Sequence, residues 1–219
     1  MFGPELFDFL RELRENNDRE WFAANKHRYE AHAKVPMLHF IARFGERLQE
    51  VSPHFMADAR PQGGSMFRIY RDIRFSKDKS PYKTGLAAHF RHRSAGDVHT
   101  PGFYLHIEPG NSVGGGGIWH PDTRSLARIR DAIASDTVEW DAVRAMGVDL
   151  EGDALKRPPA GYAADHPHID DLKRKDFYAM ISFTDSEICG PDFVDRYVEA
   201  CRTVSPLVRF IADTLDLPF

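Results

Sequence analysis

The sequence contains few cysteines and no long apolar run. Its 219 residues include only two cysteines, Cys189 and Cys201, and no Cys-x-x-Cys pair. Two cysteines do not favour a disulfide framework, and the lack of a Cys-x-x-Cys pair excludes a thiolate zinc site. No stretch approaches the roughly eighteen apolar residues that a membrane span needs, and the first residues lack the basic and apolar regions of a signal peptide. We therefore expect a soluble, cytoplasmic protein without a membrane segment.

Several catalytic signatures are absent as well. The sequence has no His-Glu-x-x-His motif, so a zincin site is excluded. The glycine run at residues 114–117 lacks the Gly-Lys-Ser/Thr ending of a phosphate-binding P-loop. The sequence therefore identifies no cofactor, and the glycine run is more typical of a β-bulge.

The charge is mildly acidic overall but unevenly distributed. The net charge is −4 and the pI about 6.3, which makes general nucleic-acid binding an unfavourable interpretation. Residues 68–83 carry a net charge of +4, so the remainder of the chain carries −8. The six cations of this segment are Arg68, Arg71, Arg74, Lys77, Lys79 and Lys83.

Hydrophobic periodicity predicts one α+β domain over residues 1–219. Residues 4–51 have helical spacing, with an Asn17/Glu20 capping box and a helix start at Pro36. Period-two alternation then predicts short strands at 67–75, 86–90, 103–107, 114–119 and 177–183. This succession favours an antiparallel sheet of four or five strands, packed by N-terminal and C-terminal helices.

The cationic segment is the first candidate site. On a strand, Arg71 shares a face with Phe67, Ile69, Ile73 and Phe75, where an unpaired charge would be costly. Guanidinium groups bind phosphate and carboxylate oxygens in bidentate fashion. We therefore predict a small anionic ligand at a hairpin, bound by Arg68, Tyr70, Arg71, Arg74, Lys77, Lys79, Tyr82 and Lys83. The alternative is a solvated hairpin whose arginines pair with carboxylates elsewhere in the protein.

A histidine and carboxylate set is the second candidate. His106 and Glu108 fall on one face of a predicted strand. Beside a bound anion they would serve as general acid and base. Together with His120 or His168 they would instead provide ligands for a divalent transition metal, although their spacing matches no known metal signature.

The central segment resembles a known family. The run Phe67-Arg68-Ile69-Tyr70-Arg71-Asp72-Ile73-Arg74-Phe75-Ser76-Lys77-Asp78-Lys79-Ser80-Pro81-Tyr82-Lys83-Thr84 is similar to the signature of domain-of-unknown-function family 2461. Residues 16–22, 115–119, 155–159 and 166–170 are similar to that family as well. The resemblance spans nearly the whole chain and implies one intact domain, but it supplies no substrate or catalytic residue.

Three functions are compatible with these features. The first is binding of a phosphate- or carboxylate-bearing small molecule, with or without acid–base chemistry. The second is a metal-dependent enzyme, and the third is a non-catalytic module that docks an acidic partner. Sequence does not decide between binding and turnover, and it leaves the oligomeric state open.

Overall fold

The N-terminal region is helical, as predicted. The computed structural model describes residues 1–94 and 99–219 and begins with α1 (Pro4–Glu15), α2 (Arg19–Arg28), the π-helix η1 (Tyr29–Lys34) and α3 (Val35–Val51). The predicted cap of α2 was wrong: the carboxylate of Asp18, one residue after Asn17, accepts the first backbone N–H groups. The third α-helix begins at Val35, beside the predicted start at Pro36, but a π-helical turn carries the chain into it without a break.

A five-stranded antiparallel sheet occupies the middle of the chain. Its strands are β1 (Leu86–Arg91), β2 (Gly102–Ile107), β3 (Ser112–Ile118), β4 (Leu150–Glu151) and β5 (Phe177–Phe183), in the order β1-β2-β3-β5-β4. The α+β prediction is therefore confirmed. The expected glycine bulge was wrong, since residues 114–117 pair one-to-one with both β2 and β5.

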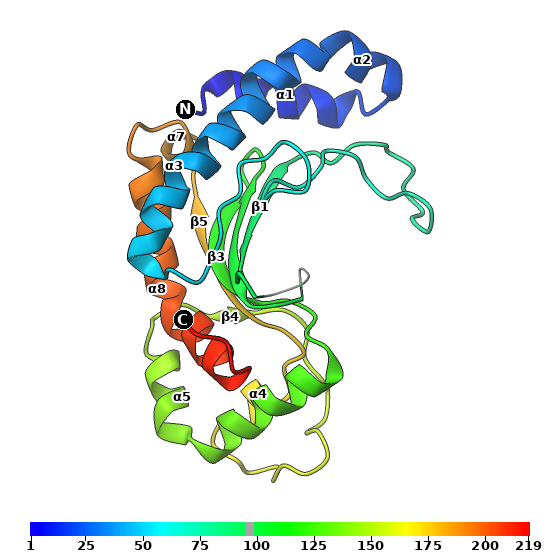
Figure 1. The fold of residues 1–219 in the computed structure, drawn as a ribbon. Helices are drawn as coiled ribbons and strands as arrows, with labels where there is room; N and C mark the ends of the chain where they lie inside the picture. The colour runs from blue at the N-terminus through cyan, green and yellow to red at the C-terminus, as the bar shows by residue number, and fades with distance from the viewer. Residues whose placement is uncertain (95–98) are drawn as a thin grey trace.

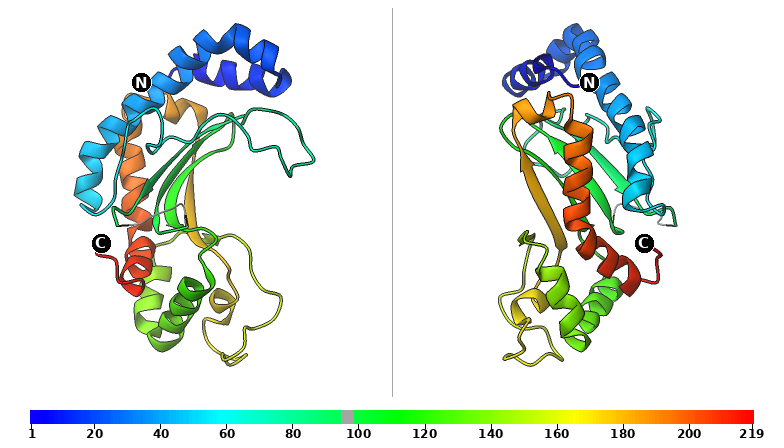
Figure 2. Two further views of the ribbon diagram at one scale, coloured as in Figure 1. Left: turned by 45° about the vertical axis from the view of Figure 1, so that its right-hand side comes forward. Right: turned by 90° about the vertical axis from the view of Figure 1, so that its left-hand side faces the viewer.

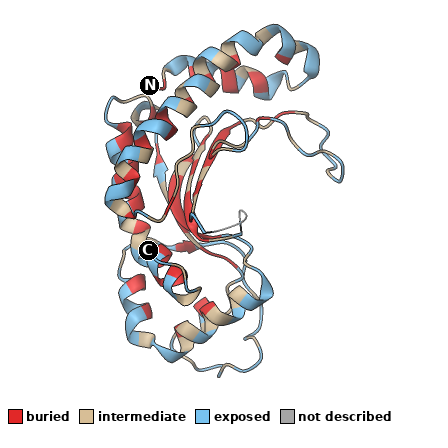
Figure 3. Ribbon diagram, viewed as in Figure 1, coloured by how far each residue is buried: buried red, intermediate tan, exposed pale blue. Residues whose placement is uncertain are grey.

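The convex face of the sheet carries the hydrophobic core. Inward-facing residues alternate along β1 and β2 and pack towards α3 and α8 (Phe193–Thr214), which lie behind the sheet (Figures 1 and 2). A Cβ at Gly114 would lie 2.6 Å from the Tyr197 ring, and one at Gly116 would lie 2.8 Å from Val208. These two glycines let α8 lie directly against β3. Buried residues accordingly concentrate on this side (Figure 3).

The remaining helices lie around the two ends of the sheet. They are α4 (Thr123–Ser135), α5 (Thr137–Arg144), α6 (Ile169–Leu172) and α7 (Asp185–Ile188). In Figure 1 α1 and α2 lie at one end and α4 and α5 at the other, and both groups extend past the sheet on its open side. The concave face is therefore flanked at both ends. Within the described residues, no helix is long and apolar enough to cross a membrane.

The cationic segment forms an arm and not the predicted strand. Residues 70–82, here called the arm, extend away from the sheet on its open side (Figure 1). Their pairing is limited to a Tyr70–Tyr82 bridge, flanked by backbone hydrogen bonds from Arg71 N to Pro81 O and from Lys83 N to Ile69 O. The strand prediction failed because its alternation does not match burial: Phe75, expected on the apolar face, is 95% exposed.

Candidate functional site: a cavity on the concave face of the sheet

The concave face contains a cavity of about 720 Å³. All five strands supply its wall, β4 through the carboxylate-bearing Glu151, and residues at the base of the arm supply its edge. Alternation determines which side chains reach it: while Phe103, Leu105 and Ile107 of β2 are buried in the core, Tyr104 and His106 point to the opposite face. The volume is in the range of small-molecule sites.

The lining combines flat rings with a bare strip of backbone. Phe67, Tyr104, Trp119 and Tyr178 contribute aromatic side chains from four different segments. Between them, the glycine run of β3 contributes no side chain, and Gly116 and Gly117 line the cavity with their backbone. A substitution at Gly117 would strain the chain, because its φ is +140° and a Cβ would lie 2.1 Å from Phe177 O. This part of the cavity wall therefore consists of backbone without side chains.

Two histidine rings rest on glycines of neighbouring segments. His89 of β1 lies over Gly102, where a Cβ would be 2.5 Å from its Nε2. His106 of β2 lies over Gly85, where a Cβ would be 2.9 Å from its Cε1. Both histidines line the cavity. Burial, followed by the charge of nearby Arg91, lowers the pKa of His89 to about 4, so its imidazole is neutral at pH 7.

Glu108 joins His106 to the surrounding elements. Its Oε1 accepts hydrogen bonds from Thr84 Oγ1 at 2.8 Å and from Arg14 of α1 at 3.0 Å. Its Oε2 lies 3.3 Å from His106 Nε2 and 3.4 Å from Asn111 Nδ2. Burial raises the pKa of Glu108, but the hydrogen bonds from Thr84, His106 and Asn111 outweigh it and leave the pKa below its usual value. The carboxylate is therefore ionised and paired with His106 at neutral pH.

Two of the predicted cations reach the cavity. Arg71 and Lys83 both line it, together with Tyr82. Arg71 forms an ion pair with Asp78 of the arm. Lys83 Nζ lies 5.2 Å from the centre of the Phe67 ring and has no carboxylate partner among residues 1–94 and 99–219. Burial, followed by the charge of Arg68, lowers the pKa of Lys83.

The other predicted anion-binding residues lie outside the cavity lining. Arg74 pairs with Asp72 at 2.6 Å, and Lys79 Nζ donates to Ile73 O at 2.9 Å. Tyr70 is 51% exposed. Arg68 and Lys77 are also exposed, and neither side chain lines the cavity. The eight residues of the predicted set therefore do not converge on one point. Arg71, Tyr82 and Lys83 line the cavity, Arg68 lies just before the arm, and the other four lie on the arm.

The alternative metal set is not brought together. Among the residues that the structure describes, no group of three or more His, Cys, Asp or Glu side chains is placed to hold a metal ion. His120 lines a different hollow, beside the start of α4, and His168 Nε2 lies 3.3 Å from Asp141 Oδ1. Of the residues in that set, only His106 and Glu108 line the cavity on the concave face of the sheet.

Comparison with known proteins places this architecture in a family. A family model described as a conserved hypothetical protein matches residues 5–210 of the chain. The chain belongs to the DUF2461 family. No curated protein matches it, and no solved structure does. The resemblance seen in the sequence is thereby confirmed. For this DUF2461 chain the function has to be argued from the cavity itself.

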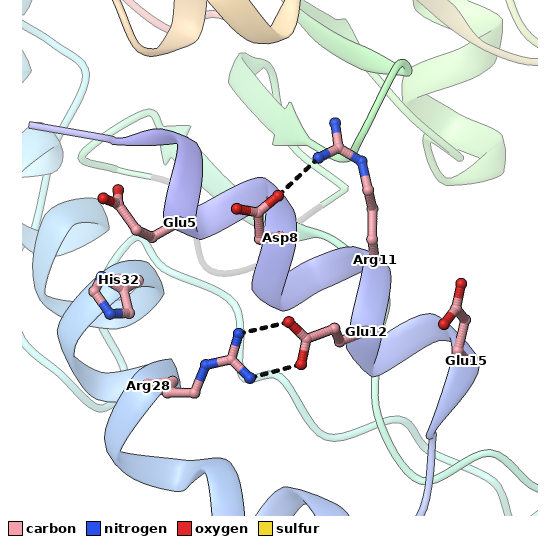
Figure 4. A pocket seen from close by; sticks show the side chains of 7 residues that line it. All are labelled: Glu5, Asp8, Arg11, Glu12, Glu15, Arg28 and His32. Carbon is pink, nitrogen blue, oxygen red and sulfur yellow. Dashed lines mark hydrogen bonds and ion pairs between the residues drawn. The ribbon is translucent and has the colours of Figure 1, made fainter.

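In another hollow of the DUF2461 chain, between α1 and the following helices, both arginines are already paired with carboxylates. It measures about 360 Å³ and is lined by charged side chains of α1, α2 and η1 (Figure 4). Arg28 contacts both carboxylate oxygens of Glu12, at 2.6 and 2.7 Å, and Arg11 contacts Asp8 at 3.2 Å. Because these cations are matched by carboxylates of the same hollow, the cavity on the sheet is the stronger candidate.

Sequence reasoning missed several residues of the DUF2461 cavity. His89, Thr84, Trp119 and Tyr178 were not among the candidates, yet all four line it. The signal for His89 was available: Leu86, Ala88 and Phe90 were assigned to the core, so His89 had to face the opposite side. Trp119 and Thr84 lie beyond strand ends, where alternation no longer predicts direction.

Proposed function

We propose that this protein binds a small molecule that carries a phosphate or carboxylate group, in the cavity on the concave face of the sheet. Lys83, with Arg71 beside it, forms the anion-binding end, and the aromatic wall contacts a flat apolar body. The observation that carries the proposal is Lys83 itself. A partly buried ammonium group without a carboxylate partner among the described residues is stabilised by an anion from outside.

The shape of the wall supports the second half of the proposal. Aromatic rings that surround a strip of glycine backbone leave a flat surface, and the mostly apolar lining rewards burial of an equally flat ligand. Arg71 is a second cation that could bind the anionic group of the ligand. Its guanidinium pairs with Asp78 in the free protein, and a phosphate or carboxylate would compete for it.

A titration with matched ligands tests this function. The ligands are phenyl phosphate, benzoate and the neutral isostere benzamide, and the dissociation constant of each is measured by calorimetry. We expect both anions to bind and benzamide to bind at least roughly tenfold more weakly, since a charge-assisted hydrogen bond contributes about 1.5–3 kcal/mol. Lys83→Met should weaken the binding of both anions by a similar factor. Lys26→Met, on the exposed face of α2, should leave their binding unchanged. Equal affinity for benzoate and benzamide would contradict the proposal.

Docking of an acidic partner is the second candidate, and the tip of the arm favours it. Phe75 is 95% exposed and lies beside Arg74, whose guanidinium carbon is 5.8 Å from the ring centre. An exposed aromatic among cations is typical of a binding epitope. Pull-down with an acidic peptide at increasing salt, using Phe75→Ser, tests it. Binding that is insensitive to salt and to this substitution would rule it out.

A further inference from the structure

The bare backbone of Gly117 is the floor of a niche inside the cavity. Gly117 pairs with Gly102 of β2 on one side and with Tyr178 of β5 on the other. The His89 ring lies over Gly102. The Tyr178 ring leans the other way, over Gly152, where a Cβ would lie 3.1 Å from its Cε1. Two strand spacings separate Gly102 from Tyr178, so the niche is about 10 Å wide and admits a flat ring with a hydrogen bond at each edge.

The polar side chains beside this niche have no partner in the protein. His89, Tyr178 and Glu151 all line the cavity. Within residues 1–94 and 99–219, none of the three side chains makes a hydrogen bond or an ion pair. The imidazole of His89 is neutral, so it carries one N–H donor and one acceptor nitrogen. Because buried polar groups are nearly always hydrogen-bonded, an unpartnered imidazole facing a cavity points to a ligand that supplies the partner.

Glu151 gives this end of the cavity a negative charge. It lies directly across the β4–β5 ladder from Tyr178. Burial, followed by the charges of Glu151, Asp176 and Asp153, raises the pKa of Tyr178. Asp176 already accepts the backbone N–H groups of His120 and Asp153, at 2.7 and 3.0 Å, and neither aspartate lines the cavity. Glu151 is therefore the carboxylate that faces a ligand here.

Tyr104 lies between the niche and the anion-binding end. Lys83 Nζ is 5.2 Å from the centre of the Phe67 ring, and that centre is 6.3 Å from the centre of the Tyr104 ring. Tyr104 in turn is two residues from Gly102 on the same strand, and both line the cavity. A ligand that reaches both Lys83 and Glu151 therefore needs a spacer between its acidic group and its ring.

We propose that the niche over Gly117 binds an amino-bearing nitrogen heterocycle, with Glu151 accepting a hydrogen bond from the amino group and His89 pairing with the opposite edge of the ring. The faces of such a ring suit the aromatic wall, and its edge supplies the donors and acceptors that these side chains lack. The inference rests on the proposed function and names its ligand class: the heterocycle is joined through a spacer to the phosphate or carboxylate group at Lys83.

Two neutral nucleosides isolate the niche from the anion-binding end. Adenosine carries an amino group, and purine riboside differs from it only in lacking that group. In calorimetry we expect adenosine to bind at least roughly fivefold more tightly, because its amino group donates to a charged acceptor. Glu151→Ala should abolish this preference, whereas Glu46→Ala, which removes an exposed carboxylate of α3, should keep it. His89→Phe should weaken the binding of both nucleosides severalfold.

Two results would overturn the inference. One is equal affinity for adenosine and purine riboside, or no detectable binding of either. The other is a Glu151→Ala protein, shown to be folded by its thermal unfolding, that keeps the preference for adenosine. Loss of folding is not expected, because the Glu151 carboxylate contacts no cation among the described residues.

Adenosine monophosphate separates this inference from the proposed function. If both hold, the monophosphate should bind at least roughly tenfold more tightly than adenosine, and Lys83→Met should remove that gain without changing adenosine binding. A preference for adenosine over purine riboside without any gain from the phosphate would support the niche and refute the anion-binding end. Binding of phenyl phosphate that depends on Lys83, without a preference for adenosine, would refute the niche alone.

Discussion

The side-chain amide of Asn17 makes two hydrogen bonds with the backbone of Tyr82, 65 residues away in sequence. Its Nδ2 donates to Tyr82 O and its Oδ1 accepts from Tyr82 N, each at 3.0 Å. The Tyr82 ring stacks on Phe22 of α2 with 4.0 Å between ring centres. The loop between α1 and α2 therefore holds the base of the arm, next to the two cations that line the cavity.

Loss of this amide should loosen the arm. For Asn17→Ala we expect about 1–3 kcal/mol of lost unfolding free energy in urea, because two part-buried hydrogen bonds disappear. Amide exchange should also accelerate at residues 69–83. Asn25→Ala is the matched control, since among the described residues its side-chain amide hydrogen-bonds only to Trp21 and Arg28 of α2. Equal effects of the two substitutions on arm exchange would show that Asn17 does not anchor the arm.

Asp78→Asn should strengthen anion binding. The hydrogen bonds from Ser80 and the ion pair with Arg71 hold the pKa of Asp78 well below its usual range, so it carries a full negative charge that occupies Arg71. Its removal frees a guanidinium at the cavity, and we expect the dissociation constant for phenyl phosphate to fall severalfold in calorimetry. Asp72→Asn frees Arg74 instead, outside the cavity lining. An equal gain from both variants would mean that only net charge matters.

His89 should make stability depend on pH. Its pKa is about 4 when folded and near 6.5 when unfolded, so the unfolded chain binds the extra proton between these values. The effect of His89 on the unfolding free energy is therefore absent above about pH 6.5. As the pH falls towards 4, the unfolding free energy decreases by up to about 3 kcal/mol. His89→Gln should flatten this part of the urea-midpoint profile, whereas His27→Gln should keep it. A wild-type profile already flat in this window would refute the prediction.

Gly102→Ala should displace His89. The new Cβ would lie 2.5 Å from His89 Nε2 and 2.8 Å from Phe90 O, and the second contact is with backbone that cannot move freely. We expect a loss of about 1–3 kcal/mol in unfolding free energy and a pKa of His89 closer to its unfolded value, read by NMR titration. Gly45→Ala on α3 meets only Ala57, at 3.1 Å, and serves as the control. An unchanged His89 titration in Gly102→Ala would contradict the proposed seating of the ring.

Local sequence patterns predicted the sheet and the helices but not the arm. Strands β1, β2 and β5 and the long C-terminal helix followed from period-two and helical spacing, because these segments bury one face in a common core. The segment 67–75 shows a similar alternation, yet its outer part packs against nothing and Phe75 stays in solvent. Alternation records a tendency to pair, and only tertiary structure determines whether a partner strand is present.

The candidate site was predicted only in part, because local patterns do not show which segments come together in the fold. Charge density drew attention to the cations of the arm, but arginines in a short hairpin have carboxylates within reach, and Asp72 and Asp78 take two of them. His106 and Glu108 were found because they share a strand face. Their relation to Lys83 and His89 depends on which segments the sheet brings together, and no local pattern contains that information.

The central claim is that Lys83 marks the anion-binding end of the cavity. Crystals of the protein with phenyl phosphate test it most directly. The account predicts phosphate oxygens within hydrogen-bonding distance of Lys83 Nζ and the phenyl ring against the wall formed by β2, β3 and β5. Phosphate bound only to the outer cations of the arm, with the cavity empty of ligand, would contradict it.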